Sequence, residues 1–256
     1  MEKRKVLITG AAGRIGTAFR REHGDRYAFR LVDRRPVEAP GEHECWVADL
    51  VDLNEARRAC EGIDTVLHLA ADPNSRATFY DTLLPLNVLM AYNLFHAAAD
   101  QGCRRLVFAS SIHAVSAYPL DVQIHPLDPI LPADLYGVTK CFGEALCAYY
   151  AAREGLSCIA VRIGAVGIPA RVENSDDPRI LALWISERDL SQLLHKCIEA
   201  PDSVRHLIVQ GVSDNQFKRM DISNAREILG YEPQDNAFRL SSKVQIAPRR
   251  PDEPDV

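Results

Sequence analysis

Short apolar runs alternate with longer helical patterns along the first two thirds of the chain, and this alternation restricts the fold more than any other feature of the sequence. A helix between two strands carries the chain back across a sheet, so that successive strands run parallel. The strand-like runs are apolar almost throughout, as burial on both faces of a sheet requires. The sequence therefore predicts an α/β fold, a Rossmann-type doubly wound parallel sheet. The expected strands span 5–10, 29–33, 45–49, 65–70, 105–111 and 158–164, and the expected helices lie near 14–23, 54–61, 84–101 and 134–154.

The pattern changes after residue 165. The segment 167–179, GIPARVENSDDPR, predicts a polar loop that is long enough to act as a functional loop or lid. The elements that follow are too few for a second core, and they comprise a helix near 187–200, a strand near 206–210 and a short helix near 221–229. We therefore expect a Rossmann core over 1–165, a small cap over 166–241 that completes the same domain, and a flexible tail over 242–256.

Composition argues against several classes of partner. The net charge is −5 and charges of both signs are interspersed, so that nothing favours a nucleic acid. No apolar run approaches the length of a transmembrane helix, and we expect no membrane partner. The N-terminus enters the first strand without a secretory signal and the seven cysteines contain no Cys-x-x-Cys pair, which predicts reduced thiols in a cytoplasmic protein. The eight histidines are dispersed as well, and we expect no metal site.

Three glycines, Gly10, Gly13 and Gly16, follow the first strand and open the first helix in the stretch ITGAAGRIG. In a dinucleotide-binding turn the first glycine adopts a positive φ, the second admits a diphosphate, and the third lets the helix pack against the strand. The helix N-terminus then offers free N–H groups to the phosphates. Such a triplet also occurs for structural reasons alone, but its place between a strand and a helix favours a dinucleotide site.

The end of the second strand indicates which dinucleotide is bound. Asp33 stands where a carboxylate accepts hydrogen bonds from the ribose hydroxyls of NAD and repels the 2′-phosphate of NADP. Arg34 and Arg35 follow directly and could attract that phosphate. The sequence therefore favours NAD, with NADP as the alternative.

Two further strand ends offer cofactor contacts. Asp49, after the third strand, could bond the adenine amino group, and the alternative is a helix N-cap. Ala70 and Ala71, after the fourth strand, have side chains small enough for a cofactor to lie against them.

Tyr136 and Lys140 stand four residues apart, on one face of the expected helix 134–154. An ammonium group near a phenol favours the phenolate, which can then act as a base. An isolated pair of this kind is often just a tyrosine and a lysine on a half-exposed helix. The fifth strand, however, ends in Ser110 and Ser111, at the edge of a parallel sheet where ligands bind. A glycine loop, a strand-end serine and Tyr-x-x-x-Lys in this order favour catalysis.

With these motifs the chain resembles the extended short-chain dehydrogenases/reductases over nearly its whole length. Within them, VFASSIHAV, LYGVTKCFGE, VRIG and VSDN with AREILGYEPQDNA resemble the group that contains uronate dehydrogenases and archaeal NAD-dependent glucose-6-phosphate dehydrogenases, with sulfoquinovose dehydrogenases as a related group. The resemblance implies oxidation of a pyranose at its anomeric carbon to a lactone.

The resemblance also implies roles for individual residues. Tyr136 is the expected base, Lys140 its partner and Ser111 the third catalytic residue, while Ser110 faces the cofactor. Asn87 is expected to support this network, and its alternative role is to satisfy buried backbone groups. The other expected cofactor contacts come from Arg14, Ile15, Leu50 and Ile163, with Gly164 beside the last of these.

The substrates of this group carry an anion at C6, and the resemblance assigns that anion to Arg179, with Ser75 and His113 as further substrate ligands. An arginine binds carboxylate, phosphate and sulfonate alike, so it predicts an anion without naming it. Ile112 replaces the asparagine of the uronate dehydrogenase motif, and the segment 167–179 is longer than expected there, so that a standard uronate pocket is not expected. The alternative for His113 is a histidine packed near the sheet edge. Arg76 and Arg171 are expected to be solvated surface charges.

Helices 84–101 and 134–154 are apolar nearly all round, and the resemblance implies that they form the interface of a homodimer or larger homo-oligomer. Burial under the cap is the alternative. Two other functions stay open at this point: a nucleotide-sugar epimerase or dehydratase that retains its NAD, and a non-catalytic NAD-binding sensor.

Overall fold

The computed structural model describes residues 3–38, 41 and 43–244, and within them a parallel sheet of seven strands forms the centre of the molecule. The strands lie in the order β3-β2-β1-β4-β5-β6-β9. The direction of winding reverses between β1 and β4, and in such sheets ligands bind outside the carboxyl ends of the strands at this point. The predicted doubly wound α/β fold is confirmed. The strands are β1 (Lys5–Thr9), β2 (Ala28–Asp33), β3 (Glu44–Val47), β4 (Thr65–His68), β5 (Arg105–Ser111), β6 (Ser157–Ile163) and β9 (His206–Gly211).

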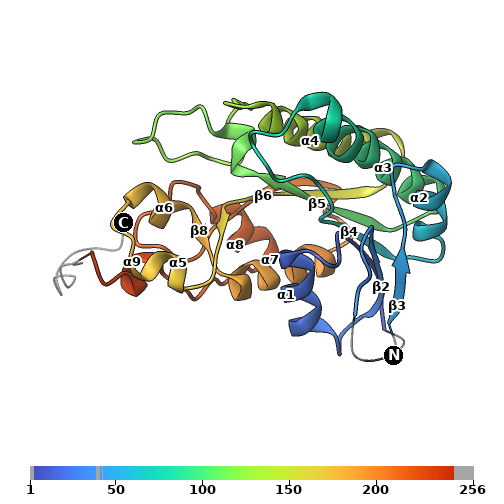
Figure 1. Ribbon diagram of the computed structural model, residues 1–256, viewed down its shortest axis with the longest axis horizontal. Coiled ribbons are helices and arrows are strands. Elements are labelled where there is room, and N and C mark those ends of the chain that lie inside the picture. Colours follow the sequence, from blue (N-terminus) through green and yellow to red (C-terminus); the bar gives the residue numbers. More distant parts are fainter. Residues whose placement is uncertain (1–2, 39–40, 42, 245–256) are drawn as a thin grey trace.

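Helices cover both faces of the sheet (Figure 1). Leu7 and Leu106 point to one face and the adjacent Ile8 and Val107 to the other, and each set lies in a separate apolar core. This is why the strands read as continuous apolar runs. The first core is covered by α2 (Leu53–Cys60), α3 (Met90–Asp100) and α4 (Leu135–Arg153), and the second by α1 (Arg14–His23), α7 (Glu187–Glu199) and α8 (Ser223–Leu229). No helix of the described residues combines the length and hydropathy needed to cross a bilayer.

The helix expected over 84–101 begins earlier than predicted. A wide-turned π-type helix, η1 (Phe79–Leu89), precedes α3, and the N–H of Met90 bonds to the carbonyl of Pro85, five residues back. Proline has no N–H to donate, so the regular α-helical ladder is interrupted around Pro85. The apolar pattern alone did not show this change in the width of the helix.

The segment 167–179, predicted as a loop, is partly helical. It contains α5 (Ala170–Glu173) and the start of α6 (Pro178–Leu183), where Asp177 caps α6 by accepting a hydrogen bond from the N–H of Arg179. These helices and α9 (Ala237–Leu240) pack around Trp184 and Phe238, at one end of the molecule (Figure 1). The small strands β7 (Ala165–Val166) and β8 (Trp184–Ile185) join this part to the end of β6. The tail was expected to be flexible from residue 242, but Ser242 donates two hydrogen bonds to the carbonyl of Glu173 and Val244 packs near Trp184. The rest of the expected tail, 245–256, lies outside the described residues.

Candidate active site

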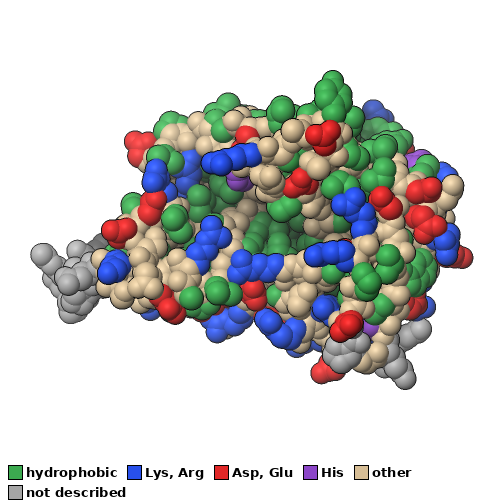
Figure 2. Space-filling model, in the orientation of Figure 1, with side chains coloured by type: hydrophobic (Ala, Val, Ile, Leu, Met, Phe, Trp, Pro, Cys, Tyr) green, Lys and Arg blue, Asp and Glu red, His purple; other side chains and the backbone are tan. Residues whose placement is uncertain are grey.

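A cavity of about 950 Å³ opens where the carboxyl ends of β1, β2, β4, β5 and β6 meet the cap. Figure 2 shows this hollow, with Lys and Arg side chains along its rim. The predicted site residues that line it are Gly10, Gly13, Arg14, Ile15, Gly16, Asp33, Leu50, Ala70, Ala71, Ser110, Ser111, His113, Tyr136, Lys140 and Ile163. Four other predicted residues, Asp49, Ser75, Asn87 and Arg179, are not part of its lining.

The glycine loop is shaped to receive an anionic group at the start of α1. Gly10 has a φ of +69°, and a Cβ placed on it would lie 2.8 Å from the backbone nitrogen of Ala70. A Cβ on Gly16 would lie 2.9 Å from the Cα of Ala11. Gly13 begins the helix without any side-chain cap, which leaves first-turn N–H groups free for a ligand. The loop therefore fits the diphosphate of a dinucleotide.

Asp33 is held firmly at the end of β2. One carboxylate oxygen, Oδ2, accepts a hydrogen bond from the N–H of Ala12 at 3.0 Å, and the other accepts one from the N–H of Arg35 at 3.0 Å. Each oxygen keeps a lone pair for a further donor, as recognition of ribose hydroxyls requires. Arg34 and Arg35 also line the cavity, so the sequence-based alternative of a phosphate-binding role is compatible with their position.

Asp49 has a local role in the chain. Its Oδ1 accepts a hydrogen bond from the N–H of Val51 at 3.1 Å, and the N-cap of α2 is Asp52. The neighbouring Ala48 and Leu50 line the cavity instead.

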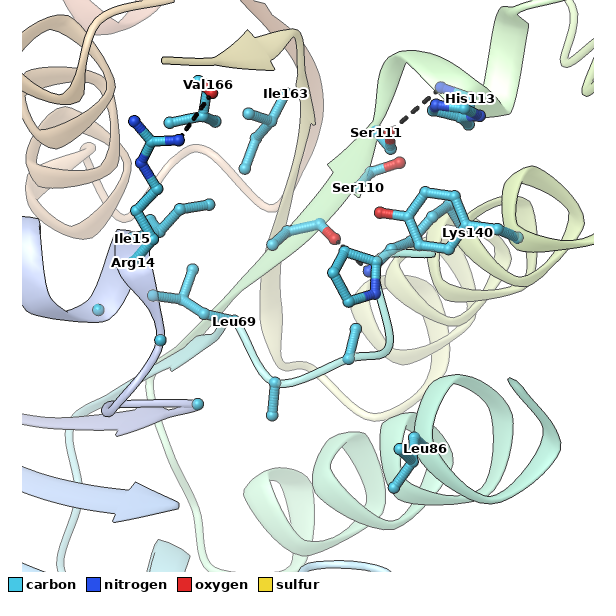
Figure 3. A pocket seen from close by; sticks show the side chains of 18 of the residues that line it. Arg14, Ile15, Leu69, Leu86, Ser110, Ser111, His113, Lys140, Ile163 and Val166 are labelled. Atoms are coloured by element: carbon cyan, nitrogen blue, oxygen red, sulfur yellow. Dashed lines mark hydrogen bonds between the residues drawn. The ribbon is translucent and has the colours of Figure 1, made fainter. Parts of the chain in front are cut away.

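Tyr136 and Lys140 lie on the first turns of α4, beside the end of β5. Asp134 caps this helix by accepting a hydrogen bond from the N–H of Gly137 at 2.8 Å. A side chain on Gly137 would collide with the carbonyl of His113, so that glycine lets the helix start close against the segment after β5. The close-up shows Ser110, Ser111 and Lys140 on one side of the cavity and Arg14 on the other (Figure 3).

From the sequence, the ammonium of Lys140 was expected to favour the phenolate of Tyr136, but burial shifts the pKa values of both groups against their charged forms. Burial raises the pKa of Tyr136 to about 12, and contact with the Ser111 hydroxyl acts in the opposite direction. Burial also lowers the pKa of Lys140 to about 8, and its Nζ donates to the carbonyl oxygen of Ala109 at 2.9 Å. The ammonium lies 5.5 Å from the centre of the Tyr136 ring. In the protein alone, desolvation therefore outweighs the groups that favour phenolate.

His113 lines the cavity next to the tyrosine. Its Nδ1 lies 2.6 Å from Oδ2 of Asp134, and its ring meets that of Tyr136 edge-on, with the centroids 5.2 Å apart. A carboxylate only accepts, so Nδ1 carries the hydrogen of this bond. The second ring nitrogen, Nε2, stays available to a ligand.

Asn87 is buried and does not line the cavity, but it contacts the elements that do. Its Oδ1 accepts from the N–H of Asp72 at 2.8 Å, while its Nδ2 donates to the carbonyl of Asp72 at 3.0 Å and to Oγ1 of Thr139 at 3.1 Å. These bonds tie the segment after β4 to α4. They satisfy buried backbone, which was the alternative role of this residue, and at the same time fix the helix that carries Tyr136.

The cap presents a different arginine to the cavity from the one predicted. Arg171 lines the cavity, and its guanidinium and that of Arg14 both approach the carbonyl oxygen of Val166, at 3.5 and 3.2 Å. Arg179 instead forms an ion pair with Asp177, with Nη2 2.6 Å from Oδ2, and its side chain is 64% exposed. Arg171 lies in α5 and Arg179 at the start of α6, and a segment predicted as a loop gave no basis for choosing between them.

One buried ion pair, Glu144 with Arg162, was not predicted from the sequence. Arg162 lies in β6 and Glu144 in α4, and both are buried beneath the cavity. The signals were present: an arginine inside the apolar run CIAVRIG, and a glutamate eight residues after Tyr136, on the same side of the helix. Among the described residues no group of three metal-binding side chains was found.

Comparisons with known proteins found a matching family model and several similar proteins. The model of the NAD dependent epimerase/dehydratase family matches residues 6–192. The NAD-dependent glucose-6-phosphate dehydrogenase of Haloferax volcanii is 37% identical over 92% of this chain and 95% of its own. The uronate dehydrogenase of Pseudomonas putida is 33% identical over 97% of this chain and 91% of its own. A mutant of the Agrobacterium tumefaciens uronate dehydrogenase, solved in complex with NAD, is similar with a TM-score of 0.83 and 32% identity, covering 98% of this chain and 93% of that one.

Proposed function

The chain belongs to the NAD dependent epimerase/dehydratase family, and from this premise we propose that it is an NAD-dependent sugar 1-dehydrogenase. It oxidises an aldopyranose at C1 to the lactone. The observation that carries the proposal is the meeting of Ser111, Tyr136 and Lys140 in the cavity that the glycine loop also lines. The similarity to sugar dehydrogenases over more than nine tenths of this chain favours this reaction over an epimerase.

In this reaction Tyr136 takes the proton of the anomeric hydroxyl while C1 gives up a hydride, and the sugar loses two electrons in becoming the lactone. The bound cofactor supplies a hydride acceptor and a positive charge at its nicotinamide ring. Ser111 holds the reacting oxygen through its hydroxyl. Because the pKa of Tyr136 is raised to about 12, formation of the phenolate calls for positive charge nearby, and the Lys140 ammonium, 5.5 Å from the centre of the phenol ring, is the group proposed to supply it.

The residues that would hold NAD are those of the cavity wall. First-turn N–H groups of α1 bind the diphosphate, Asp33 accepts from the adenosine ribose, and Ala70 and Ala71 leave room beside them. Arg14, Ile15, Leu50, Ser110 and Ile163 complete this set.

The proposed sugar carries an anion at C6. Two arginines of the cap are candidate ligands for this anion. Arg171 lines the cavity, whereas Arg179 does not line it and forms an ion pair with Asp177. An exposed ion pair contributes little stability, so exchange of Asp177 for a substrate anion would cost Arg179 little. His113, with its Nε2 available, and Ser75 complete the proposed substrate contacts.

The experiment that tests the function is NADH formation with purified protein, NAD and a panel of glucuronate, galacturonate, glucose 6-phosphate, sulfoquinovose and neutral aldoses. Turnover of one anionic sugar supports the proposal, and Tyr136→Phe should then abolish turnover while NAD still binds. Full turnover by Tyr136→Phe contradicts the assignment of the base. Sugar conversion without net NADH would instead indicate an epimerase.

A matched pair of variants identifies the anion ligand. The substitution that removes the ligand, Arg171→Met or Arg179→Met, should raise KM for the anionic sugar by about tenfold or more, as loss of a charged hydrogen bond predicts. The other substitution serves as the control, because both remove one cap guanidinium. If neither changes KM, the anion is not bound by these arginines.

We also propose that the protein works in the cytoplasm as a homodimer through η1, α3 and α4. Large apolar side chains on these helices are exposed to solvent: Leu84, Leu89, Tyr92, Val138 and Tyr149. Light scattering measures the molar mass of the protein in solution. The mass of a monomer, with the same mass for the Tyr92→Arg variant, would rule out this interface.

A further inference from the structure

A buried polar network lies directly beneath the proposed active site, and its two charged members, Glu144 and Arg162, take no part in the mechanism above. Glu144 and Arg162 form its ion pair, with side chains that are only 4% and 1% exposed. Arg162 Nε donates to Glu144 Oε1 and Arg162 Nη2 donates to Oε2, both at 2.9 Å. The third member is Ser110, whose Oγ lies 2.6 Å from Glu144 Oε1. The network thus connects α4, β6 and the cavity end of β5.

The position of the hydrogen between Ser110 and Glu144 follows from the other bonds. Guanidinium N–H groups already donate to both oxygens of Glu144, and an arginine does not give up its proton in a protein. Glu144 is therefore an acceptor on both oxygens. The hydrogen in the bond to Ser110 must come from the serine hydroxyl, which has only one.

The adjacent serine has the opposite arrangement. Ser111 Oγ accepts a hydrogen bond from the N–H of His113 at 3.2 Å, so its own hydrogen is not committed to that bond. Both serines line the cavity. Toward a ligand, Ser110 can only accept, whereas Ser111 can donate.

We propose that the buried Glu144–Arg162 pair is a positioning device that holds the Ser110 hydroxyl as an acceptor toward the cofactor, while the N–H of His113 leaves Ser111 able to donate. Burying two charges is costly, and apolar replacements of such pairs often cost no stability, so stability alone is a weak explanation for this pair. The donor that Ser110 accepts from is an N–H group of the cofactor, and the carboxamide of the nicotinamide carries one. This inference rests on the proposed function for its cofactor but not for its sugar.

The test compares binding of NAD with binding of nicotinic acid adenine dinucleotide, in which a carboxylate replaces the carboxamide and offers no N–H. Wild-type protein should prefer NAD, measured as the ratio of the two dissociation constants by calorimetry. In Ser110→Ala, and in the double variant Glu144→Leu with Arg162→Met, that preference should fall by about five- to tenfold, the effect of one neutral hydrogen bond. The double variant leaves no unpaired charge in the core.

Arg105→Met is the matched control. Arg105 is also fully buried, but it lies at the opposite end of β5 and donates to Ser157 and to the carbonyl of Ala200. Its loss should lower stability and leave the preference unchanged. An unchanged preference in folded Ser110→Ala overturns the inference, even if the double variant does not fold. A protein that binds NAD with the expected preference but oxidises no sugar would refute the proposed function alone.

Discussion

Replacing Gly10 with alanine is expected to destabilise the protein more than the same change at Gly62 or Gly102. The three glycines have nearly identical φ angles of +69°, +67° and +68°. An added Cβ meets nothing within 4 Å at Gly62 or Gly102, whereas at Gly10 it would lie 2.8 Å from the nitrogen and 2.9 Å from the Cα of Ala70. Backbone strain is therefore common to all three, and only Gly10 adds a collision.

The magnitudes follow from these two effects. A left-handed conformation costs a residue with a Cβ about 1–2 kcal/mol, and this is the expected loss at Gly62 and Gly102. Overpacking adds about 1–3 kcal/mol, so that Gly10→Ala should lose about 2–5 kcal/mol of unfolding free energy. The collision involves backbone on both sides, which cannot rotate away as a side chain can.

Urea denaturation of the three variants measures the difference, and NADH fluorescence titration measures the effect on the cofactor site. Gly10→Ala should also weaken NADH binding by about tenfold or more, because relief of the collision moves the loop away from Ala70. The two control variants should bind NADH as the wild type does. Equal losses of stability in all three variants would refute the close approach of Gly10 and Ala70 as the reason for this glycine.

Three further predictions concern pH and the cofactor. Burial lowers the pKa of His23 from 6.5 to about 4 and that of His68 to about 3, so in acid the unfolded chain binds more protons than the folded one. The unfolding free energy should therefore fall as pH drops below about 6.5. Urea denaturation at neutral and acid pH checks this, and equal midpoints would contradict it. Because the pKa of Tyr136 is raised to about 12, kcat/KM for the sugar should rise with pH up to about 8 and then level off, where Lys140 loses the ammonium charge that supports the phenolate; a profile that is flat below pH 8 would argue against a tyrosine base. Asp33→Asn keeps an acceptor and removes the charge, so the ratio of kcat/KM for NADP to that for NAD should rise by about tenfold; an unchanged ratio would show that Asp33 does not select the cofactor.

Much of the site could be predicted because its signals are local. The turn at Gly10 needs a conformation that favours glycine, and the i, i+4 spacing places Tyr136 and Lys140 on one face of a helix in any protein. Strand-end positions follow from the alternation of strands and helices, so the amino-acid pattern was enough to place Ser111 and Asp33 at the ligand-binding edge of the sheet.

The cap was predicted less well. Its helices α5 and α6 have only four and six residues, too short for an apolar period to be recognised. Without the period, the direction of each arginine was undetermined: Arg171 is exposed, as predicted, and it also lines the cavity, which was not predicted.

The sequence by itself thus determined the sheet, the dinucleotide loop and the order of the catalytic motifs, since hydrophobic period and backbone conformation are properties of neighbouring residues. Only the tertiary structure decided the raised pKa of Tyr136, the choice of arginine at the cavity and the union of Ser110, Glu144 and Arg162. A local pattern can show an arginine in an apolar strand or a glutamate on a helix. It cannot show how far a group is desolvated, or which of these side chains meet, because the contacting residues lie 18 to 34 positions apart.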